Sequence, residues 1–442
     1  MHNRRNQMNI YEKIIASAQA QAEELTALRR DLHKHAETGW LEMRTTSIIA
    51  RKLTDLGYEI LLGEDVCLKE SRMGVPSQKV LEEAYQRAID QGADPEFVEA
   101  TRGGMTGVIG ILRCGEGPVL AMRFDMDALG VIESDEPDHF PTAQGFASIN
   151  HGAMHACGHD GHTCVGLGVA KTLMQIKDQL HGTIKLIFQP AEEGVRGAKS
   201  IVDKGHLEGV DYVLGAHVSN LTKNGCDLVP GAFGSLSTSK YDVVFRGKSA
   251  HAGVAPQEGN NALLAAATAL LNLQAIPRSG GGATRINVGK LVGGTGRNVI
   301  ADEAFMEIEV RGDTSELNEY MSQYALRILE NAAAMHQCTV EIRLMGASCS
   351  ITSDKALAER IAQLSKTHLD VTVSDNVMIK SGGSEDYAYM ITRVQEQGGQ
   401  GVFMRIHADM AGPSHNRRFD FDESFIPRGI KIFCGAAYDI LK

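Results

Sequence analysis

The residues most able to do chemistry in this chain lie together in one stretch, HACGHDGHT, which runs from His155 to Thr163. A thiolate and an imidazole on one side of the backbone suit a borderline or soft divalent metal. Cys157 and His159 are two positions apart, so an extended segment would place them on the same side. A polar loop with one buried cysteine explains the stretch alone equally well. A nucleophilic cysteine is a weaker interpretation, because such cysteines usually begin a helix and Cys157 precedes one.

Further candidate ligands follow apolar runs that predict strands. They are Asp125 and Asp127 in DMDAL, Glu192 and Glu193 in QPAEEG, His217 in GAHV, and His415 in the turn GPSHN. Functional groups gather at the carboxyl ends of strands in α/β folds. One of two adjacent carboxylates can bind a metal while the other acts as general base on a water. Taken singly, the acidic pair is better explained as a helix start, but the combined set is typical of a hydrolytic site with two metals.

A second group of polar residues lies later in the chain. It comprises His251 in SAHAG, Asn298 in GRNVI and Arg311 in VRG. Such side chains on a separate domain suit a lid that holds an oxyanion and a substrate carboxylate. Ion pairs between domains are the alternative explanation, which the pattern leaves open.

The order of the expected elements predicts an α/β fold. Strands are expected at 107–113, 118–126, 182–190 and 211–218, helices at 9–36, 43–56 and 161–176, and a charged insertion at 64–104, helical around 77–91. Strands that alternate with helices indicate a layered α/β sheet. From 238 the order becomes strand, helix, two strands, helix, strand, which is typical of a small two-layer α+β domain. We therefore predict a discontinuous catalytic domain, 1–237 and 347–442, with an inserted βαββαβ lid or dimerisation domain, 238–346.

Composition narrows the class of partner. The net charge is −11, basic residues are scattered and there is one tryptophan, so nucleic acid is a poor partner. No apolar run is long enough to span a membrane, and the N-terminus has no apolar segment of a secretory signal. The eight cysteines show no paired framework and indicate reduced thiols. We expect a cytoplasmic protein that uses local arginines to hold any anionic substrate.

Eight motifs occur in an order that resembles one family. They are DMDAL, HACGHDGHT, QPAEEG, GAHV, SAHAG, GRNVI, SGGSEDYA and SHN. The family is that of the metal-dependent amidohydrolases that include glutamate carboxypeptidase, aminoacylases and indole-acetyl-amino-acid hydrolases. The insertion with ESRMG and GGMTG, together with LIFQPAEEG and RFDFDE, resembles the first of the two subunits of the p-aminobenzoyl-glutamate hydrolases. The resemblance covers nearly the whole chain and implies a metallopeptidase-type catalytic domain.

The resemblance also implies a role for each motif. Two divalent ions per chain, Mn²⁺ or Zn²⁺, would be bound by Cys157, His159, Glu193, His217 and His415. Glu192 would be the general base, and His251 would stabilise the oxyanion in the partner's site across a dimer. Arg311 would hold the substrate carboxylate with help from Asn298. Where the carboxypeptidase branch has H-x-D, this chain has DMD, so Cys157 would take the bridging place.

The implied reaction is hydrolysis of the amide that joins p-aminobenzoate to glutamate. One alternative is an aminoacylase or N-acyl-amino-acid hydrolase with the same machinery. Another is a chain that is active only beside a related second subunit, so the dimer could be of like or unlike chains. A binding protein without turnover is a third, and Glu192 argues against it, because metal storage needs no second carboxylate beside a ligand.

Overall fold

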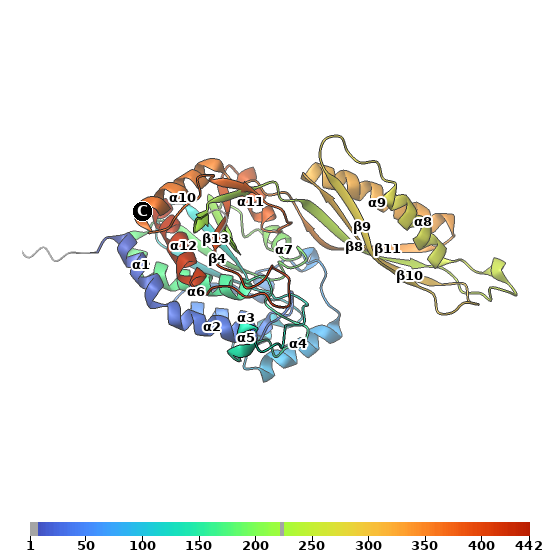
Figure 1. Cartoon of the computed structure of the whole chain (residues 1–442), viewed down its shortest axis with the longest axis horizontal. Coiled ribbons are helices and arrows are strands. Elements are labelled where there is room, and N and C mark those ends of the chain that lie inside the picture. The colour runs from blue at the N-terminus through green and yellow to red at the C-terminus, as the bar shows by residue number, and fades with distance from the viewer. Residues whose placement is uncertain (1–7, 222–224) are drawn as a thin grey trace, which may run out of the picture. The chain divides into compact units, whose positions relative to one another are not determined.

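The computed structural model describes residues 8–221 and 225–442, which form two compact units (Figure 1). The larger unit comprises Met1–Phe233, Ile351–Lys380 and Asp386–Lys442, and the smaller comprises Gly234–Ser350 and Ser381–Glu385. The chain therefore leaves the larger unit, builds the smaller one and returns, apart from a second short contribution to the smaller unit at Ser381–Glu385. This is the discontinuous arrangement of a sheet-and-helix unit that carries an insertion.

A seven-stranded mixed sheet forms the centre of the larger unit. Its order is β1 (Glu59–Leu62), β2 (Val108–Arg113), β4 (Thr183–Gln189), β3 (Val119–Asp125), β5 (Tyr212–Ser219), β13 (Gln400–His407) and β6 (Leu228–Val229). The four central strands β4, β3, β5 and β13 are parallel, and the outer ones are antiparallel to their neighbours. A two-stranded sheet pairs β7 (Gly231–Phe233) with β12 (Met378–Lys380). The carboxyl ends of the central strands therefore meet at one edge.

The larger unit contains ten α-helices within its described residues, most of which cover this sheet as expected for a layered α/β fold. They are α1 (Ile10–Ala20), α2 (Ala22–Lys34), α3 (Met43–Asp55), α4 (Gln78–Asp90), α5 (Phe140–Ala143), α6 (His159–Gln175), α7 (Ala198–Asp203), α10 (Lys355–His368), α11 (Ala388–Glu396) and α12 (Phe425–Leu441). Helix α6 is buried on nearly all sides and packs against α2, α12 and the sheet. The predicted fold class is confirmed. Among the described residues, no helix combines the length and the apolar character needed to cross a bilayer.

The smaller unit is a four-stranded antiparallel sheet with two helices on one face (Figure 1). Its sheet order is β11 (Thr339–Ser348), β8 (Ser237–Arg246), β10 (Glu303–Gly312) and β9 (Thr284–Gly293), and its helices are α8 (Ala262–Gln274) and α9 (Ser315–Met335). Alternate residues of β8 and β10 are buried under the helices, around Val243, Phe245, Met306 and Val310. The βαββαβ order read from the sequence is the order found.

The insertion at 64–104 shares a small apolar cluster with the residues before α3 and at its start. Leu81, Ala84 and Ala88 of α4 pack with Leu41 and Met43. The single tryptophan, Trp40, is fully buried and donates its indole N–H to the Met73 carbonyl at 2.7 Å. The insertion is therefore folded onto the larger unit beside the start of α3.

Two local expectations differ from the structure. The helix expected at 9–36 is interrupted at Gln21, whose side chain amide donates to Ser17 and Thr172 instead of facing solvent. The segment from Cys157 to His159 is not extended, because Gly158 adopts φ +90° and His159 begins α6. A Cβ at Gly158 would lie 2.7 Å from Val218, so both the backbone and the space require glycine there.

Close packing of α6 on the sheet predicts a stability effect. A Cβ at Gly166 would lie 2.6 Å from Phe188 and 2.7 Å from Phe124. Gly166→Val should lower the free energy of unfolding by about 1–3 kcal/mol, because the core cannot accept the added atoms without strain. Urea unfolding followed by Trp40 fluorescence measures this. Gly130→Val is the matched control, since no atom lies within 4 Å of that position, and equal losses in the two variants would contradict the packing argument.

Candidate metal and catalytic site

The candidate residues of the larger unit gather at the carboxyl edge of the parallel strands. Asp125 is the last residue of β3, His217 lies near the end of β5, and Glu192 and Glu193 follow β4 by three and four residues. Because β4, β3 and β5 are neighbours in that order, their ends present these side chains to a common space. His415 joins them from a turn whose backbone N–H donates to the Ala156 carbonyl at 2.7 Å.

Two groups of possible metal ligands share one thiol. Cys157, His159 and His217 form one group, and Cys157, Glu193 and His415 form the other, with the ligand atoms of each group within 4.8 Å of one another. The Cys157 Sγ lies 3.3 Å from His217 Nε2, and His415 Nε2 lies 3.6 Å from a Glu193 oxygen. The structure thus brings all five predicted ligands together. A thiolate in this position can face two cations at once.

Hydrogen bonds direct the inner nitrogens of two imidazoles into the cluster. His217 Nδ1 lies 2.6 Å from the Val218 carbonyl, which can only accept, so Nδ1 carries the proton and Nε2 keeps a lone pair. His159 Nδ1 lies 3.3 Å from Asp127 in the same manner. Partners of this kind orient histidine ligands in metal sites.

Two buried atoms of the cluster lack a hydrogen-bond partner within the described part of the chain. They are His159 Nε2 and one carboxylate oxygen of Glu193. Buried polar atoms are nearly always satisfied, and a cation bound between His159 Nε2 and the Glu193 oxygen would satisfy both. This donor set of nitrogen, sulfur and oxygen fits divalent zinc or manganese.

The pKa shifts of the cluster also indicate that its acidic groups lack enough positive charge nearby. Burial, and next the Glu193 carboxylate, raise the pKa of the Cys157 thiol. Burial also raises the pKa of Glu193 to about 7. Burial alone would lower the pKa of His159, but Asp125 and Asp127 outweigh it and raise that pKa well above the ordinary value. A bound divalent ion would reverse the shifts of the acidic groups.

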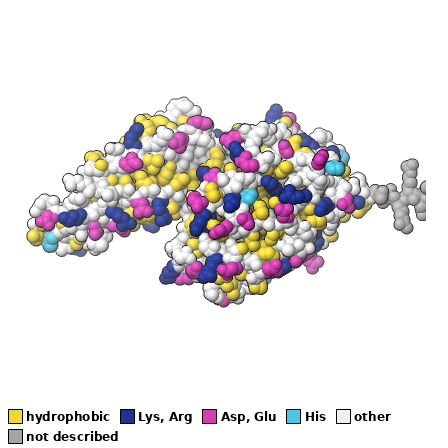
Figure 2. Space-filling model, turned by 180° about the vertical axis from the view of Figure 1, so that it is seen from behind, with side chains coloured by type: hydrophobic (Ala, Val, Ile, Leu, Met, Phe, Trp, Pro, Cys, Tyr) yellow, Lys and Arg dark blue, Asp and Glu magenta, His cyan; other side chains and the backbone are white. Residues whose placement is uncertain are grey.

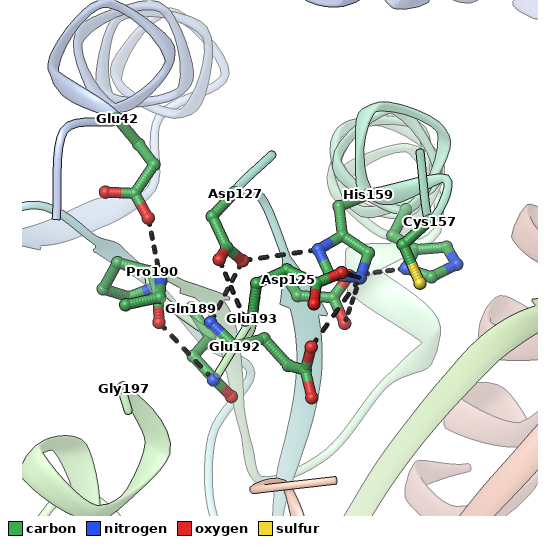
Figure 3. Close-up of polar contacts among 12 residues, drawn as sticks. Glu42, Asp125, Asp127, Cys157, His159, Gln189, Pro190, Glu192, Glu193 and Gly197 are labelled. Carbon is green, nitrogen blue, oxygen red and sulfur yellow. Dashed lines mark hydrogen bonds and ion pairs between the residues drawn. The ribbon is translucent and has the colours of Figure 1, made fainter. Parts of the chain in front are cut away.

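The turn that carries the two glutamates is held by three buried carboxylates, of which Figure 3 shows Glu42 and Asp127. Glu42 accepts the N–H of Ala191 at 2.8 Å. Asp127 accepts the N–H groups of Glu192 at 3.0 Å and Glu193 at 2.9 Å, one on each oxygen. The third is Asp386, which accepts from Gly197 and Ala198. Ala191 has φ +51°, an uncommon value for a residue with a Cβ, and these bonds keep the turn in that form.

His162 has a different role from the other histidines of its motif. Its Nδ1 contacts Asp125, and its Nε2 accepts the backbone N–H of Val218 at 2.9 Å. Both ring nitrogens are therefore used, so His162 braces β3 against β5, although its ligand atom also lies within 4.8 Å of those of Asp125 and His159. Asp125 in turn is paired with the buried Arg123.

A family model describes a large part of this chain. The model of peptidase family M20/M25/M40 matches residues 121–439. The chain belongs to this family.

Relatives in the family share nearly the full length. The chain is 44% identical over 402 residues to an indole-3-acetyl-aspartic acid hydrolase of Enterobacter agglomerans, covering 91% of this chain and 92% of the relative. It is 42% identical over 420 residues to one subunit of the p-aminobenzoyl-glutamate hydrolase of Escherichia coli, with 94% and 95% covered. The expected resemblance to this hydrolase branch is therefore confirmed.

Solved structures agree with this assignment. An aminobenzoyl-glutamate utilization protein from Klebsiella pneumoniae has a TM-score of 0.82 and 37% identity, covering 96% of this chain and 97% of its own. A dinuclear metal-binding peptidase of the M20 family from Bacillus subtilis has a TM-score of 0.62 and 27% identity, covering 96% and 99%. The protein is thus a hydrolase of the M20 family, with ligand groups suited to divalent metals.

In this M20 protein the predicted lid residues lie in the smaller unit. Residues 250–252 pair with 298–300, which brings His251 and Asn298 together, and both segments are exposed. Arg311 lies on β10 and forms a two-point ion pair with Glu309, with 3.0 Å contacts to both oxygens. In the sheet, Arg311 pairs with Thr238 on β8, whereas the loop of His251 follows the far end of β8 at Arg246. Eight strand residues, roughly 26 Å, separate these two ends.

Sequence reasoning missed the residues that position the ligands. Glu42 lies outside the motifs, and Asp386 lies within SGGSEDYA, but the local pattern of neither residue indicates that it holds the turn. Arg196 was also missed. Its side chain donates to the Glu193 carbonyl at 2.8 Å and the Gly74 carbonyl at 3.2 Å, which ties the insertion to the turn that carries Glu192 and Glu193. The only signal in the sequence for this role was the presence of a basic residue, Arg196 itself, two positions after QPAEEG.

The position of Asp127 predicts an effect on metal affinity. Asp127→Asn turns one oxygen into an N–H₂ group that opposes a backbone N–H, so the turn and the His159 ring lose their fixed orientation. Outer partners of ligands typically contribute 10- to 100-fold to affinity, and we expect a loss of about this size for Zn²⁺ in a competition titration. Asp211→Asn is the control, since Asp211 accepts the Val119 N–H at the opposite end of β3. Unchanged affinity in Asp127→Asn would contradict this role.

Proposed function

We propose that this protein hydrolyses the amide between an aromatic acyl group and an acidic amino acid, with p-aminobenzoyl-glutamate as the main substrate. The observation that carries the proposal is the position of Glu192, a second buried carboxylate directly beside the two groups that share Cys157. A site that only stores metal needs no such group. The substrate is supported by the two relatives, whose names both describe hydrolysis of an aromatic acyl derivative of an acidic amino acid.

In this proposal Cys157, His159, Glu193, His217 and His415 hold two divalent ions. When bound, such ions lower the pKa of water from about 15.7 toward 7 and polarise the amide carbonyl. Zn²⁺ suits the thiolate and imidazoles, while Mn²⁺ is the alternative. Cys157 would serve both ions, and Asp127 would then remain available to fix the turn.

Glu192 performs the proton transfers. Its carboxylate lies 4.0 Å from His159 Nε2 and faces the same space as the ligands. It takes a proton from the attacking water as the C–O bond forms, and delivers it to the amino nitrogen of glutamate as the C–N bond breaks. The products are p-aminobenzoate and glutamate. General acid–base catalysis of this kind typically contributes about 10²- to 10⁴-fold.

The lid residues are proposed to act on different active sites. Arg311 holds the substrate carboxylate, while His251 stabilises the oxyanion and Asn298 assists. The roughly 26 Å of sheet between Arg311 and the His251 loop is too long for one small substrate to contact both residues of one chain. Two copies can satisfy both roles, since each can supply His251 to its partner.

A dimer through the smaller unit accounts for the exposed surface found there. Strand β9 is an edge of its sheet, with unpaired backbone groups along one side. Val292 on β9 and Leu264 and Leu271 on α8 are exposed apolar residues of the same unit. Either a second copy or a related but different chain could cover them, and the Escherichia coli relative is named as one subunit of its hydrolase. We favour the homodimer, because this chain carries every proposed site residue.

A second candidate substrate is indole-3-acetyl-aspartate. The Enterobacter agglomerans relative that is named for this compound is 44% identical to the chain. Broader N-acyl-amino-acid hydrolysis uses the same groups with another acyl pocket. On either substrate we propose a cytoplasmic location, in keeping with the reduced thiol that the cluster needs at Cys157.

Metal removal and restoration test the function. Protein dialysed free of metal should be inactive and should release p-aminobenzoate from p-aminobenzoyl-glutamate when Zn²⁺ or Mn²⁺ is restored. Glu192→Gln should lose at least about 100-fold in turnover while binding both ions, because it cannot accept the proton. Glu116→Gln, an exposed change of the same type, is the control. Wild-type turnover in Glu192→Gln would remove the central step, and faster cleavage of indole-3-acetyl-aspartate would favour the second substrate.

Mixing of two inactive variants tests whether His251 acts across the dimer. Glu192→Gln and His251→Ala should each be nearly inactive. After dissociation and reassociation in equal amounts, half the dimers are mixed, and each has one complete site, so about a quarter of the wild-type activity should return. No recovery, despite mixed dimers seen by native mass spectrometry, would show that His251 serves its own chain or no site.

A further inference from the structure

A pocket in the smaller unit surrounds the proposed carboxylate-binding residue. It has a volume of about 270 Å³, and its charged lining residues are Arg278, Arg285, Glu309 and Arg311. Arg278 lies in the loop between α8 and β9, Arg285 on β9, and the other two on β10. Three basic side chains from separate segments therefore converge with one acidic one.

The sheet register places two of these arginines side by side. Arg285 is directly opposite Arg311 in the antiparallel pair β9–β10. Residues opposite each other project from the same face, with Cβ atoms about 4.5–5.5 Å apart, and like charges in such a pair are destabilising. An arginine pair in this position therefore needs compensation by an anion.

The protein supplies only part of that compensation. Glu309 engages Arg311 at both carboxylate oxygens and lies 3.9 Å from Lys240. No carboxylate in the described ranges 8–221 and 225–442 forms an ion pair with Arg278 or Arg285. Three arginines and one glutamate leave an excess of two positive charges in the pocket, in a chain whose net charge is −11.

We propose that this pocket binds both carboxylates of an acidic amino acid, so that it selects N-acyl derivatives of glutamate and aspartate. Arg311 takes the α-carboxylate, Arg285 takes the side-chain carboxylate, and Arg278 adds charge at the mouth. The two negative charges of the ligand match the excess of two positive charges. This inference rests on the proposed function, because it assigns Arg311 to the substrate.

A structural role for the arginines explains less. Charged residues on an edge strand discourage pairing with other chains, and Arg285 alone would serve that purpose. It does not explain why Arg278 and Arg311 converge on the same space. It also does not explain why Glu309 engages only one of the three arginines.

Kinetic discrimination between matched substrates tests the pocket. The ratio of kcat/KM for p-aminobenzoyl-glutamate to that for p-aminobenzoyl-glutamine measures recognition of the side-chain carboxylate alone. Arg285→Gln should lower this ratio by about 10- to 100-fold, the size expected for loss of a charge-assisted hydrogen bond. Arg285→Lys should retain part of it. Arg343→Gln should leave the ratio at its wild-type value, since Arg343 on β11 pairs with Asp242 in register and removes the same charge away from the pocket.

Binding separates failure of the pocket from failure of the proposed reaction. Calorimetry of p-aminobenzoyl-glutamate with Glu192→Gln protein should give a Kd that weakens about 10- to 100-fold when Arg285→Gln is added. Wild-type cleavage with an unchanged substrate ratio in Arg285→Gln would overturn the pocket and leave the reaction intact. Absence of cleavage with binding that depends on Arg285 would overturn the reaction alone. Binding that is absent or independent of Arg285 would overturn the pocket.

Discussion

The candidate site depends on the bonds made by one buried carboxylate, Asp127. Its two oxygens accept the backbone N–H groups of Glu192 and Glu193, and one of them also contacts His159 Nδ1. A single side chain thus fixes a proposed base, a proposed ligand carboxylate and a proposed ligand imidazole relative to one another. Because the Asp127 side chain is fully buried, these bonds do not compete with water. Loss of Asp127 would change all three positions together.

The surroundings of Asp127 extend the same principle. Glu42 fixes one end of the turn that Asp127 holds in the middle (Figure 3), and Asp386 fixes the other end by accepting from Gly197 and Ala198. Several buried carboxylates close together repel one another and are unfavourable unless positive charge lies nearby. The pKa of Glu42 shows this effect, because burial, and to a smaller extent the negative charge of Asp127, raise it to about 8. Arg123 compensates Asp125 and Asp386 on one side. Bound cations would compensate the carboxylates on the other side of the cluster. This explains why the proposed ligands and these acidic groups lie at the same edge of the sheet.

Much of this arrangement was accessible from sequence because it follows strand ends. Parallel strands bring their carboxyl ends together, so Glu193 and His217 could be expected to meet although 24 positions separate them. The order of strands and helices in the smaller unit was equally clear from its alternating apolar pattern. The sequence also predicted scattered basic residues, and basic and acidic side chains are mixed over the face seen in Figure 2.

The parts that sequence reasoning could not supply depend on backbone geometry and on distant partners. Gly158 has a left-handed backbone conformation, and this conformation turns Cys157 and His159 toward the same cluster. The sequence had suggested an extended segment instead. His162 resembles a ligand in its motif, yet a backbone N–H of β5 occupies its second nitrogen. The convergence of Arg278, Arg285 and Arg311 follows from sheet register, which a pattern of residues does not specify.

The most direct test of the account is the location of the metals relative to Cys157. Anomalous diffraction from crystals of the zinc- or manganese-loaded protein should show two peaks roughly 3.5–4 Å apart, as in other two-metal hydrolytic sites. The account predicts that the Cys157 sulfur lies between them, within coordination distance of both, with His159 and His217 on one ion and Glu193 and His415 on the other. A single ion, or two ions of which only one contacts Cys157, would contradict the shared-thiolate site.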